Sequence, residues 1–419
     1  IGKGFNMWWV EVEVMAPKRI VVLGAGYAGI RCVQDLTRLF RRDPAYKIIL
    51  VNKHNYHQFI TEIHKPAAGT ASVERTRLPI SQLIDANQVE FIKATVTRVN
   101  TEEGSLVCED GRKIKYDYLV VGLGADPEFF GIPGLEEHKL VLRSVNSARL
   151  IRAHIEKKLA EGKQQSAEER HKYWTFVVVG GGMTGIEFAG ELSEIKPKLA
   201  KEYDVPEDEI QIVTIEALPS ILCDTDPELC KHATEVLQGK GVKIITDRAV
   251  AEINDDYVKL KDGEVIPAKT VVWSAGIRGN RILEESGLLT AGRGRVVVDQ
   301  FLRSEEHPNI YAVGDCAYCI NPKTGKPAGP NAHNAIDMGA VAAKNIYNLE
   351  KGKQLVPFEE VYLGSATSLG GRSGIADMGK MRFKGVPATI FKEMINVKYV
   401  HSIGGIPLVI KRLLGHVQE

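Results

Sequence analysis

A glycine-rich motif that occurs twice, each time between an apolar strand and an amphipathic helix, is the strongest constraint on the fold of this chain. The first copy is Gly24-Ala-Gly26-Tyr-Ala-Gly29, between an expected strand at residues 19–23 and a helix that leads to a second strand at residues 47–51. The first glycine permits a tight turn, the second lets a diphosphate approach the backbone, and the third lets helix and strand pack closely. The diphosphate then lies on free N–H groups at the start of the helix. The motif therefore predicts a dinucleotide-binding βαβ unit.

The second copy of the motif is Gly180-Gly-Gly182-Met-Thr-Gly185, which follows an apolar strand at residues 175–179. The next expected strand spans residues 210–215, so this half of the chain repeats the strand, glycine turn, helix and strand of the first half. Repetition of one supersecondary block indicates two similar units. The sequence thus predicts an α/β fold with two Rossmann-like dinucleotide-binding domains.

Shorter apolar segments complete the two predicted domains. Within residues 89–121, short apolar segments alternate with residues typical of turns, which predicts small antiparallel strands. Further strands are expected at residues 270–274, 295–298 and 309–313, followed by a helix near Pro330. Two nucleotide domains in one chain favour an electron-transfer pair, in which a nicotinamide gives hydride to a flavin held by the other domain.

Polar residues that follow the expected strands are candidates for binding the nucleotides. Glu216 ends the strand after the second motif, where an acid binds both ribose hydroxyls and repels a 2′-phosphate, which favours NADH over NADPH. The alternative is a strand-end acid that faces solvent. The corresponding residues of the first half are Asn52 and Lys53, which leave its ligand open. Asp315 follows an apolar strand and a glycine, a position from which it can reach a polyol such as ribityl.

Composition excludes several other classes of protein. Lys and Arg number 54 against 53 Asp and Glu, so the net charge of +1 gives no driving force for nucleic-acid binding. No uncharged apolar run approaches the ~18 residues of a spanning helix. Six cysteines in a chain of this length do not form a disulfide scaffold and favour a reducing, cytoplasmic compartment. Residues 1–14 lack the layout of a signal peptide, and we expect them to be an extension outside the native fold that starts at Met15.

Six segments together carry a resemblance to a known family. With both glycine motifs and Asp315 in order, the chain resembles the two-domain FAD/NAD disulfide-reductase-like superfamily, and within it the type II NADH dehydrogenases, which are non-pumping NADH:quinone oxidoreductases. The resemblance extends from about Lys18 to the end of the chain. The segments that carry it are residues 52–59 (NKHNYHQF), 64–70 (HKPAAGT), 117–135 (DYLVVGLGADPEFFGIPGL), 180–192 (GGGMTGIEFAGEL), 271–280 (VVWSAGIRGN) and 399–412 (YVHSIGGIPLVIKR).

The resemblance implies that FAD binds at the first motif and NADH at the second. The residues implied for FAD are Gly24, Gly26, Gly29, Asn52, Lys53, Val96, Gly124, Asp315 and Ala332. The residues implied for NADH are Gly180, Gly182, Gly185, Glu216 and Gly276.

The resemblance also assigns a catalytic role to Glu187. This acid is expected in the first turn of a helix whose N-terminus faces the cofactors, where a carboxylate accepts a hydrogen bond from nicotinamide or moves protons toward a quinone. The alternative is an acid that only complements the helix dipole.

One segment departs from the family pattern. The family usually begins a helix at the quinone side of the flavin with Ala-Gln-x-Ala-x-Gln, whereas this chain has Ala332-His333-Asn334-Ala335-Ile336-Asp337. His333 and Asp337 are four residues apart and share a helix face, with Ile336 beside them. We hypothesise a His–Asp proton relay to the acceptor, since histidine titrates near neutral pH. The alternative is a divergent relative with a weak or different acceptor.

Cysteine and histidine spacing raises rival chemistries. Disulfide reductases carry two cysteines in the helix after the first motif, and this chain has only Cys32 there. Cys316 and Cys319 have the spacing of a redox or zinc pair, but without a second ligand pair we expect them to be structural. His54, His57 and His64 lie inside the family-like FAD segment, and we predict no metal there.

The C-terminal region is basic and amphipathic. From residue 380 onward, seven Lys and Arg accompany two acids, a net charge of +5. Such segments bind at the interface of an anionic membrane. The alternative is an apolar face packed on the body or on a second subunit of a homodimer. The face expected to be apolar comprises Ile390, Phe391, Met394 and Ile395, the opposite face Lys392, Glu393 and Asn396, and a second apolar stretch Leu408, Val409, Ile410, Leu413 and Leu414.

These observations predict a peripheral membrane enzyme on the cytoplasmic face of the cell membrane. The implied reaction is transfer of a hydride from NADH to FAD and of two electrons onward to a membrane quinone such as menaquinone, without proton pumping. Two alternatives stay open: a flavin-dependent NADH oxidoreductase with another acceptor, and a non-catalytic regulator that binds FAD and NADH. The expected units are 15–145 and 281–357 for FAD, 146–280 for NADH, and 358–419 for the membrane anchor.

Overall fold

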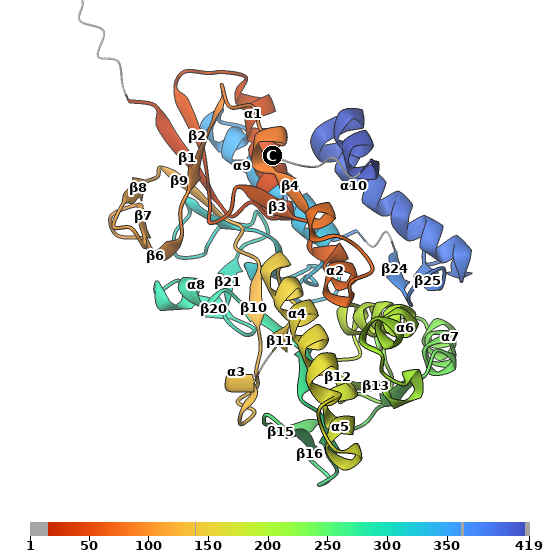
Figure 1. Cartoon of the computed structure of the whole chain (residues 1–419). Helices are drawn as coiled ribbons and strands as arrows, with labels where there is room; N and C mark the ends of the chain where they lie inside the picture. The colour runs from red at the N-terminus through yellow and green to blue at the C-terminus, as the bar shows by residue number, and fades with distance from the viewer. Residues whose placement is uncertain (1–15, 139, 362–363, 415–419) are drawn as a thin grey trace, which may run out of the picture.

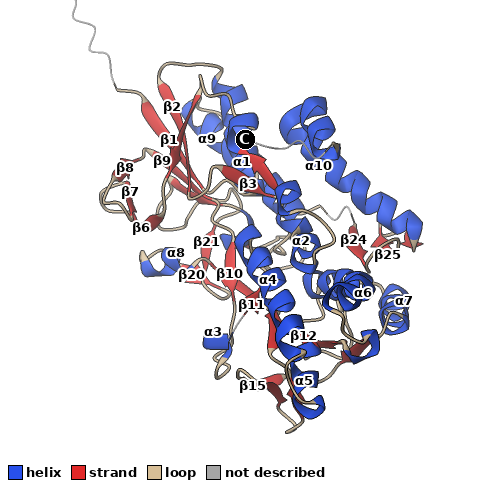
Figure 2. Cartoon of the chain, in the orientation of Figure 1, coloured by secondary structure: helices blue, strands red, loops and turns tan. Residues whose placement is uncertain are grey.

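The computed structural model describes residues 16–138, 140–361 and 364–414. The extension predicted at residues 1–14 and the last five residues of the C-terminal region lie outside these ranges. Figure 1 shows two α/β units, one above the other, and a long C-terminal helix that runs along one side of them. Helices cover both central sheets, which Figure 2 shows in red.

The first unit is built on a parallel sheet with strand order β22-β9-β1-β2-β5. Strand β22 comes from far along the chain, so the unit is assembled from two segments of the sequence. Because all five strands are parallel, their carboxyl ends meet at one edge of the sheet, where ligands bind in such folds. The strands are β1 (Lys18–Leu23), β2 (Tyr46–Asn52), β5 (Val89–Lys93), β9 (Tyr118–Val121) and β22 (Ile310–Ala312).

Two helices, α1 (Tyr27–Phe40) and α9 (Ala332–Glu350), pack against each other and against this sheet. Helix α1 buries Ile30, Val33 and Leu36, which recur every three residues and form one apolar face. The two helices approach closely because Gly339 lacks a side chain: a Cβ there would lie 2.2 Å from the Ala28 carbonyl oxygen.

The second unit repeats this plan with strand order β11-β18-β12-β13-β14, again parallel throughout. Its own core is separate from that of the first unit and includes Phe176, Phe188 and Leu229. The strands are β11 (Leu140–Val141), β12 (Thr175–Val179), β13 (Gln211–Ile215), β14 (Val242–Ile245) and β18 (Thr270–Trp273), and the helices are α4 (Val145–Gly162), α5 (Ala167–Trp174), α6 (Met183–Tyr203) and α7 (Pro227–Gly239).

Small sheets and short helices complete the two units. The small sheets comprise β3 (Tyr56–Gln58) with β4 (Arg77–Pro79), β6 (Val96–Asn100) with β7 (Ser105–Cys108) and β8 (Lys113–Lys115), β10 (Ala125–Pro127) with β19 (Ile277–Gly279), β15 (Val250–Ile253) with β16 (Tyr257–Leu260) and β17 (Val265–Pro267), and β20 (Thr290–Ala291) with β21 (Arg295–Val298) and β23 (Ala317–Cys319). The short helices are α2 (His64–Ala68), α3 (Leu135–His138) and α8 (Arg281–Glu285).

The C-terminal region forms the antiparallel sheet β24 (Ser365–Ser368), β25 (Gly374–Asp377) and β26 (Arg382–Lys384), followed by α10 (Val386–Leu413). Helix α10 is kinked at Gly405, whose φ of 67° and ψ of −170° are not helical. Beside the kink, Tyr399, Ile403 and Leu408 join the core of the first unit. The C-terminal helix is thus anchored on the unit to which the first glycine motif belongs.

The strand predictions were correct for most apolar segments and wrong in one region. Residues 89–121 contain an antiparallel trio, β6 to β8, but the two flanking segments, β5 and β9, are parallel strands of the first large sheet. Short strands look alike in sequence whether their partners are parallel or antiparallel, because tertiary pairing decides the direction. The exact domain boundaries stay predictions.

Candidate functional site

The first glycine motif forms a cradle at the start of α1. A Cβ at Gly24 would lie 2.4 Å from the Gly122 carbonyl oxygen, and one at Gly29 would lie 1.8 Å from the Gly24 carbonyl oxygen. Only glycine fits these two positions. Gly26 differs, because the nearest atom to a Cβ there is 3.8 Å away, and as the N-cap of α1 it provides no side-chain hydrogen bond. The first N–H groups of α1 therefore have no side-chain cap, as an anion-binding helix N-terminus requires.

Asn52 lies beside this cradle, at the end of β2. Its Oδ1 accepts a hydrogen bond of 3.1 Å from the Ala25 N–H, and its Nδ2 donates to the His54 carbonyl oxygen. Asn52 therefore fixes the glycine loop against β2. Lys53, the next residue, is exposed at the same edge.

Asp315 and Gly124 lie at the same edge of the first sheet, where the structure adds a residue that the sequence did not single out. Gly124 has φ 68°, and a Cβ there would lie 3.4 Å from Nη2 of Arg143. Burial lowers the pKa of the Arg143 guanidinium, and the charge of Asp315 opposes that shift. Burial likewise raises the pKa of Asp315, against the opposing charges of Arg143 and Arg295. An acid and a cation thus stand together where strands β9 and β22 end.

The remaining two residues predicted for FAD lie on neighbouring elements. Val96 begins β6 and is buried directly after β5 ends. Ala332 is the first residue of α9, whose N-cap Asn331 accepts a hydrogen bond from the Asn334 N–H at 2.8 Å. Their roles as cofactor ligands stay predictions.

The second glycine motif forms a matching cradle at the start of α6. A Cβ at Gly185 would lie 2.0 Å from the Gly180 carbonyl oxygen, whereas a Cβ at Gly182 would meet nothing within 4 Å. Gly182 is the N-cap of α6 and again provides no side-chain hydrogen bond. Gly276, which has φ 76°, follows the end of β18 and packs closely on Phe130. Helices α1 and α6 therefore share a glycine N-cap without a side-chain hydrogen bond.

Glu216 lies at the second cradle, as predicted, and its carboxylate contacts the glycine loop. Oε2 accepts a hydrogen bond of 2.6 Å from the Gly181 N–H, and Oε1 accepts one of 2.8 Å from the Leu218 N–H. Glu216 is thus fixed beside the glycine loop and is not an acid that only faces solvent.

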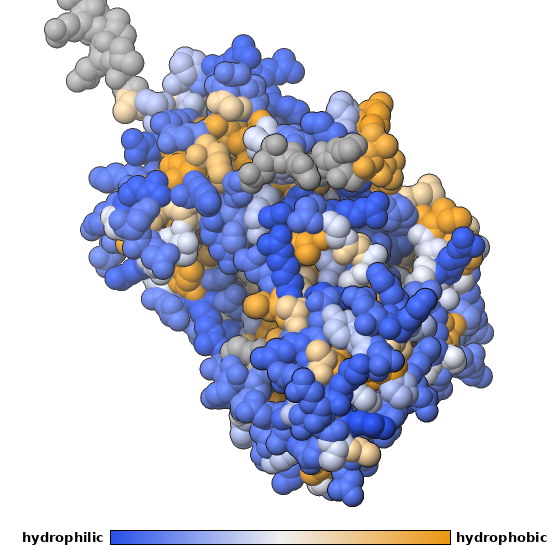
Figure 3. Space-filling model, viewed as in Figure 1, coloured by the Kyte–Doolittle hydropathy of each residue, from blue (hydrophilic) through white to orange (hydrophobic). Residues whose placement is uncertain are grey.

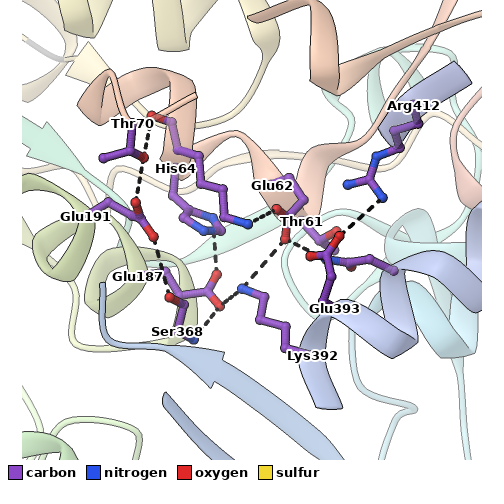
Figure 4. A network of polar contacts seen from close by, with 12 residues as sticks. Thr61, Glu62, His64, Thr70, Glu187, Glu191, Ser368, Lys392, Glu393 and Arg412 are labelled. Carbon is purple, nitrogen blue, oxygen red and sulfur yellow. Dashed lines mark hydrogen bonds and ion pairs between the residues drawn. The ribbon is translucent and has the colours of Figure 1, made fainter. Parts of the chain in front are cut away.

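Glu187 belongs to a buried cluster of charged groups, shown in Figure 4. It is the fifth residue of α6 and lies in the second turn, so the prediction of a first-turn position was wrong. Its Oε2 lies 3.3 Å from His64 Nδ1, its Oε1 accepts a hydrogen bond of 3.1 Å from the Ser368 N–H, and Oε1 also contacts Lys392 Nζ. These partners come from α2, β24 and α10, so Glu187 lies where both units meet the C-terminal region.

Burial sets the charges of this cluster. It raises the pKa of Glu187, against the lowering effect of Lys392 and of the Ser368 N–H. It lowers the pKa of His64 well below the ordinary value, with a further lowering by Lys392, so His64 is neutral. Nδ1 of His64 then donates to Glu187, and Nε2 is buried without a hydrogen-bond partner among the described residues. A raised carboxyl pKa at a buried junction is typical of a proton-transfer site.

The histidine–acid pair predicted at the start of α9 is present. His333 Nε2 lies 3.2 Å from Asp337 Oδ2, with the side chains 36% and 40% exposed, but this nitrogen makes no hydrogen bond to any described residue. Ile336, between them, packs against the core of the first unit. The three other histidines named in the sequence have different partners: His54 stacks on Tyr56, His57 contacts Ala25 and Tyr399, and His64 contacts Glu187. Among the described residues no group of three acids, histidines or cysteines is placed to hold a metal ion.

Helix α10 buries apolar residues beside its kink, but nearer its start it also buries polar residues, and it exposes a second set of apolar residues. Its polar residues Lys392 and Asn396 point into the protein, where both contact Glu62. A second set of apolar residues of α10 points outward. Figure 3 shows apolar side chains gathered along the edge where α10 lies in Figure 1. The outward apolar residues, each 43–64% exposed, are Val386, Ile390, Met394, Ile395, Ile406, Ile410, Leu413 and Leu414. The expected alternative, an apolar face packed on the body, is therefore wrong for these residues but correct for Leu408 and Val409, which pack on the core of the first unit and were wrongly assigned to the membrane.

Comparison with known proteins agrees with this geometry. Residues 18–339 match the pyridine nucleotide-disulphide oxidoreductase family. A type II NADH:quinone oxidoreductase of Staphylococcus saprophyticus is 35% identical over 94% of this chain and 98% of its own length. That of Staphylococcus aureus strain MW2 is 34% identical with the same coverage. The chain belongs to the type II NADH:quinone oxidoreductases.

Solved structures share the fold of this family member. The chain superimposes on NDH2 from Plasmodium falciparum in complex with NADH with a TM-score of 0.86, at 19% identity, over 95% of this chain and 97% of that one. The sulfide:quinone oxidoreductase of Aquifex aeolicus gives a TM-score of 0.72 at 22% identity, over 96% of this chain and 92% of that one. The predicted arrangement of two Rossmann-like domains is confirmed.

Sequence reasoning missed most of the cluster around Glu187. Lys392 was counted among the basic residues facing a membrane, yet its side chain is only 12% exposed and contacts two buried carboxylates. Glu62 and Arg143 were not singled out at all. The sequence held one sign of this arrangement. Lys392 and Asn396 lie four residues apart on the same polar face of a helix, so both are buried together if that face packs on the protein.

Proposed function

We propose that this chain is a FAD-dependent NADH:quinone oxidoreductase, with FAD in the cradle of α1 and NADH in the cradle of α6. The observation that carries the proposal is the position of Glu187. It lies on the helix of the second cradle and contacts His64 of the first unit and Lys392 of α10. A proton-transferring acid therefore lies where the two nucleotide domains and the C-terminal region meet.

The residues present fit both dinucleotides. Each cradle offers the N–H groups of a helix N-terminus that no side chain caps, and Gly26 or Gly182 puts no Cβ in the way of a diphosphate. Asp315 and Arg143 supply an acceptor and a donor for the polyol side of FAD, and Glu216 supplies acceptors for the ribose of NADH. Bound FAD supplies the two-electron chemistry, taking a hydride from NADH and giving electrons to the quinone.

The overall reaction, NADH + H⁺ + quinone → NAD⁺ + quinol, takes up one proton. Glu187 is suited to deliver it, because burial raises its pKa and its Oε1 and Oε2 have different partners. Oε2 faces the neutral His64, and Oε1 faces Lys392 and the Ser368 N–H. The carboxyl is thereby held in one orientation while it gains and loses a proton.

His333 and Asp337 are proposed at the quinone side, where other members of the family carry glutamines. Their separation of 3.2 Å places a carboxylate beside the imidazole at this side of the first unit. The pair would pass on the other proton of the quinol, which comes from the hydride that NADH gives up.

The exposed apolar face of α10 supports a peripheral attachment to the cytoplasmic face of the membrane. None of the helices in the described ranges is long and apolar enough to cross a bilayer. Burying one large apolar side chain contributes about 1.5–3 kcal/mol, so several on one helix face suffice for interfacial binding. Lys392 and Arg412 do not serve the anionic surface, because their side chains are only 12% and 11% exposed. The other five basic residues remain for that role, although Arg382 also pairs with Asp226: Lys380, Arg382, Lys384, Lys398 and Lys411.

Anaerobic mixing tests the reaction. The purified yellow protein is mixed with NADH and then with a soluble menaquinone analogue, while the flavin absorbance is followed. We expect NADH to bleach the flavin and the quinone to restore its absorbance rapidly. Bleaching followed by restoration no faster than with oxygen would indicate a different acceptor. Binding of NADH without bleaching would indicate a regulator.

Vesicle sedimentation tests the attachment. The double variant Ile390→Ser, Met394→Ser is expected to bind vesicles containing phosphatidylglycerol at least about tenfold more weakly than the unmodified protein. Leu150→Ser on α4, which also removes an exposed leucine, is the matched control and should bind normally. Unchanged vesicle binding together with conversion of a dimer to a monomer would identify the face as a subunit interface instead.

A further inference from the structure

Lys392 is shared by two buried carboxylates. Its Nζ contacts Glu187 Oε1 and lies 3.8 Å from Glu62 Oε1. Both acids are almost fully buried, with 4% of Glu62 and 7% of Glu187 exposed. Figure 4 shows the ammonium pointing between the two carboxylates, one from each nucleotide unit. Lys392 therefore pairs with Glu62 as well as with Glu187.

Glu62 is held much more firmly than Glu187. Its Oε2 accepts a hydrogen bond of 2.5 Å from Lys65 Nζ, and its Oε1 accepts one of 2.9 Å from Asn396 Nδ2. Burial alone would raise the pKa of Glu62, but the charges of Lys392 and Lys65 outweigh it and lower the pKa to about 2. Glu62 is therefore ionised at every working pH, whereas burial raises the pKa of Glu187.

We propose that Glu62 is a positioning residue, a permanent counter-ion that holds the Lys392 ammonium in place while Glu187 gains and loses its proton. When Glu187 is protonated, Lys392 still has an ionised carboxylate beside it and is not left as an unpaired buried charge, which would be strongly destabilising. When Glu187 is ionised, the negative charge of Glu62 favours its return to the protonated form. This inference rests on the proposed function of Glu187.

The other charged groups around the cluster do not replace Glu62. His64 is neutral because burial lowers its pKa. Glu191 is occupied by Thr70 Oγ1 at 2.5 Å and by Ser368. Glu393, next to Lys392 in sequence, has a half-exposed side chain and lies 3.9 Å from Arg412. Among the described residues, only Glu62 and Glu187 form ion pairs with Lys392.

Infrared spectroscopy of the holoprotein tests this role. The carbonyl band of protonated Glu187, assigned by its loss in Glu187→Gln, is titrated against pH. Because both carboxylates contact one nitrogen atom, removing the charge of Glu62 should lower the pH at which the band disappears by about one to two units. Glu62→Asp keeps the charge, so its midpoint should lie close to that of the unmodified protein. Glu393→Gln should leave the midpoint unchanged.

The outcomes separate the two proposals. A midpoint in Glu62→Gln equal to that of the unmodified protein overturns the counter-ion role, whatever the flavin assay shows. If Glu62→Gln does not fold, Lys65→Met tests the same coupling: it leaves the negative charge of Glu62 less compensated, so the midpoint should move to higher pH, opposite to Glu62→Gln and by a smaller amount, and no movement overturns the role. Failure of NADH to bleach the flavin would instead refute the proposed function. The infrared titration would still test the effect of Glu62 on the pKa of Glu187.

Discussion

His57 connects the first glycine cradle to the C-terminal helix, and its ionisation should make that connection sensitive to acid. The side chain is fully buried. Its Nδ1–H donates to the Ala25 carbonyl oxygen at 2.8 Å, and its Nε2 accepts a hydrogen bond of 3.0 Å from the Tyr399 hydroxyl. Ala25 lies inside the glycine motif and Tyr399 lies on α10. Protonation at Nε2 would remove the acceptor that the Tyr399 hydroxyl uses.

The size of the effect follows from the pKa. Burial lowers the pKa of His57 from 6.5 to about 4, although the hydrogen bond to Ala25 raises it in part. The unfolded chain therefore takes up the proton first as the pH falls. The stabilisation is fully present above about pH 6.5 and is lost as the pH falls toward 4. The full shift corresponds to about 3 kcal/mol, of which about 2 kcal/mol is lost between pH 7 and pH 5.

Thermal unfolding of the holoprotein at pH 7 and pH 5 measures this loss. In His57→Gln, the amide still donates to Ala25 but does not titrate, so its melting temperature should fall less between the two pH values than that of the unmodified protein. His401→Gln, which removes an exposed histidine from the same helix α10, is the control and should behave like the unmodified protein. Equal acid sensitivity of His57→Gln and the unmodified protein would refute the assignment.

Three further predictions concern the two cradles and the acceptor side. Gly185→Ala places a Cβ 2.0 Å from the Gly180 carbonyl oxygen, so NADH binding measured by titration should weaken at least about tenfold with the FAD content unchanged, and undiminished NADH affinity would contradict the cradle. Glu216→Gln removes the charge that repels a 2′-phosphate, so kcat/KM for NADPH relative to NADH should rise about tenfold, and a constant ratio would show that the acid does not select the cofactor. His333→Gln should slow flavin reoxidation by quinone at least about tenfold with bleaching by NADH unaffected, and an unchanged rate would reject the relay.

The two cradles and the elements around them could be predicted from local sequence. The strand predicted at residues 175–179 is β12, and the strand predicted at 295–298 is β21. Both glycine motifs lie at the start of the helices expected for them. These features follow from local chemistry, because a turn without room for a Cβ, or a buried strand of branched residues, is encoded by neighbouring residues. Even the pairing of His333 with Asp337 needed only the helical repeat.

Tertiary structure alone decided how Glu187 is surrounded. Lys392 lies 205 residues away in sequence and reaches Glu187 only because α10 packs across both units with its polar face inward. Glu62 enters the same cluster from the first unit, and Arg143 approaches Asp315 in the same way. In sequence, a lysine on an amphipathic helix has the same pattern whether it faces solvent or a buried acid. The difference is set by what packs against the helix, because the charge of a buried group depends on partners that the chain brings together only when it folds.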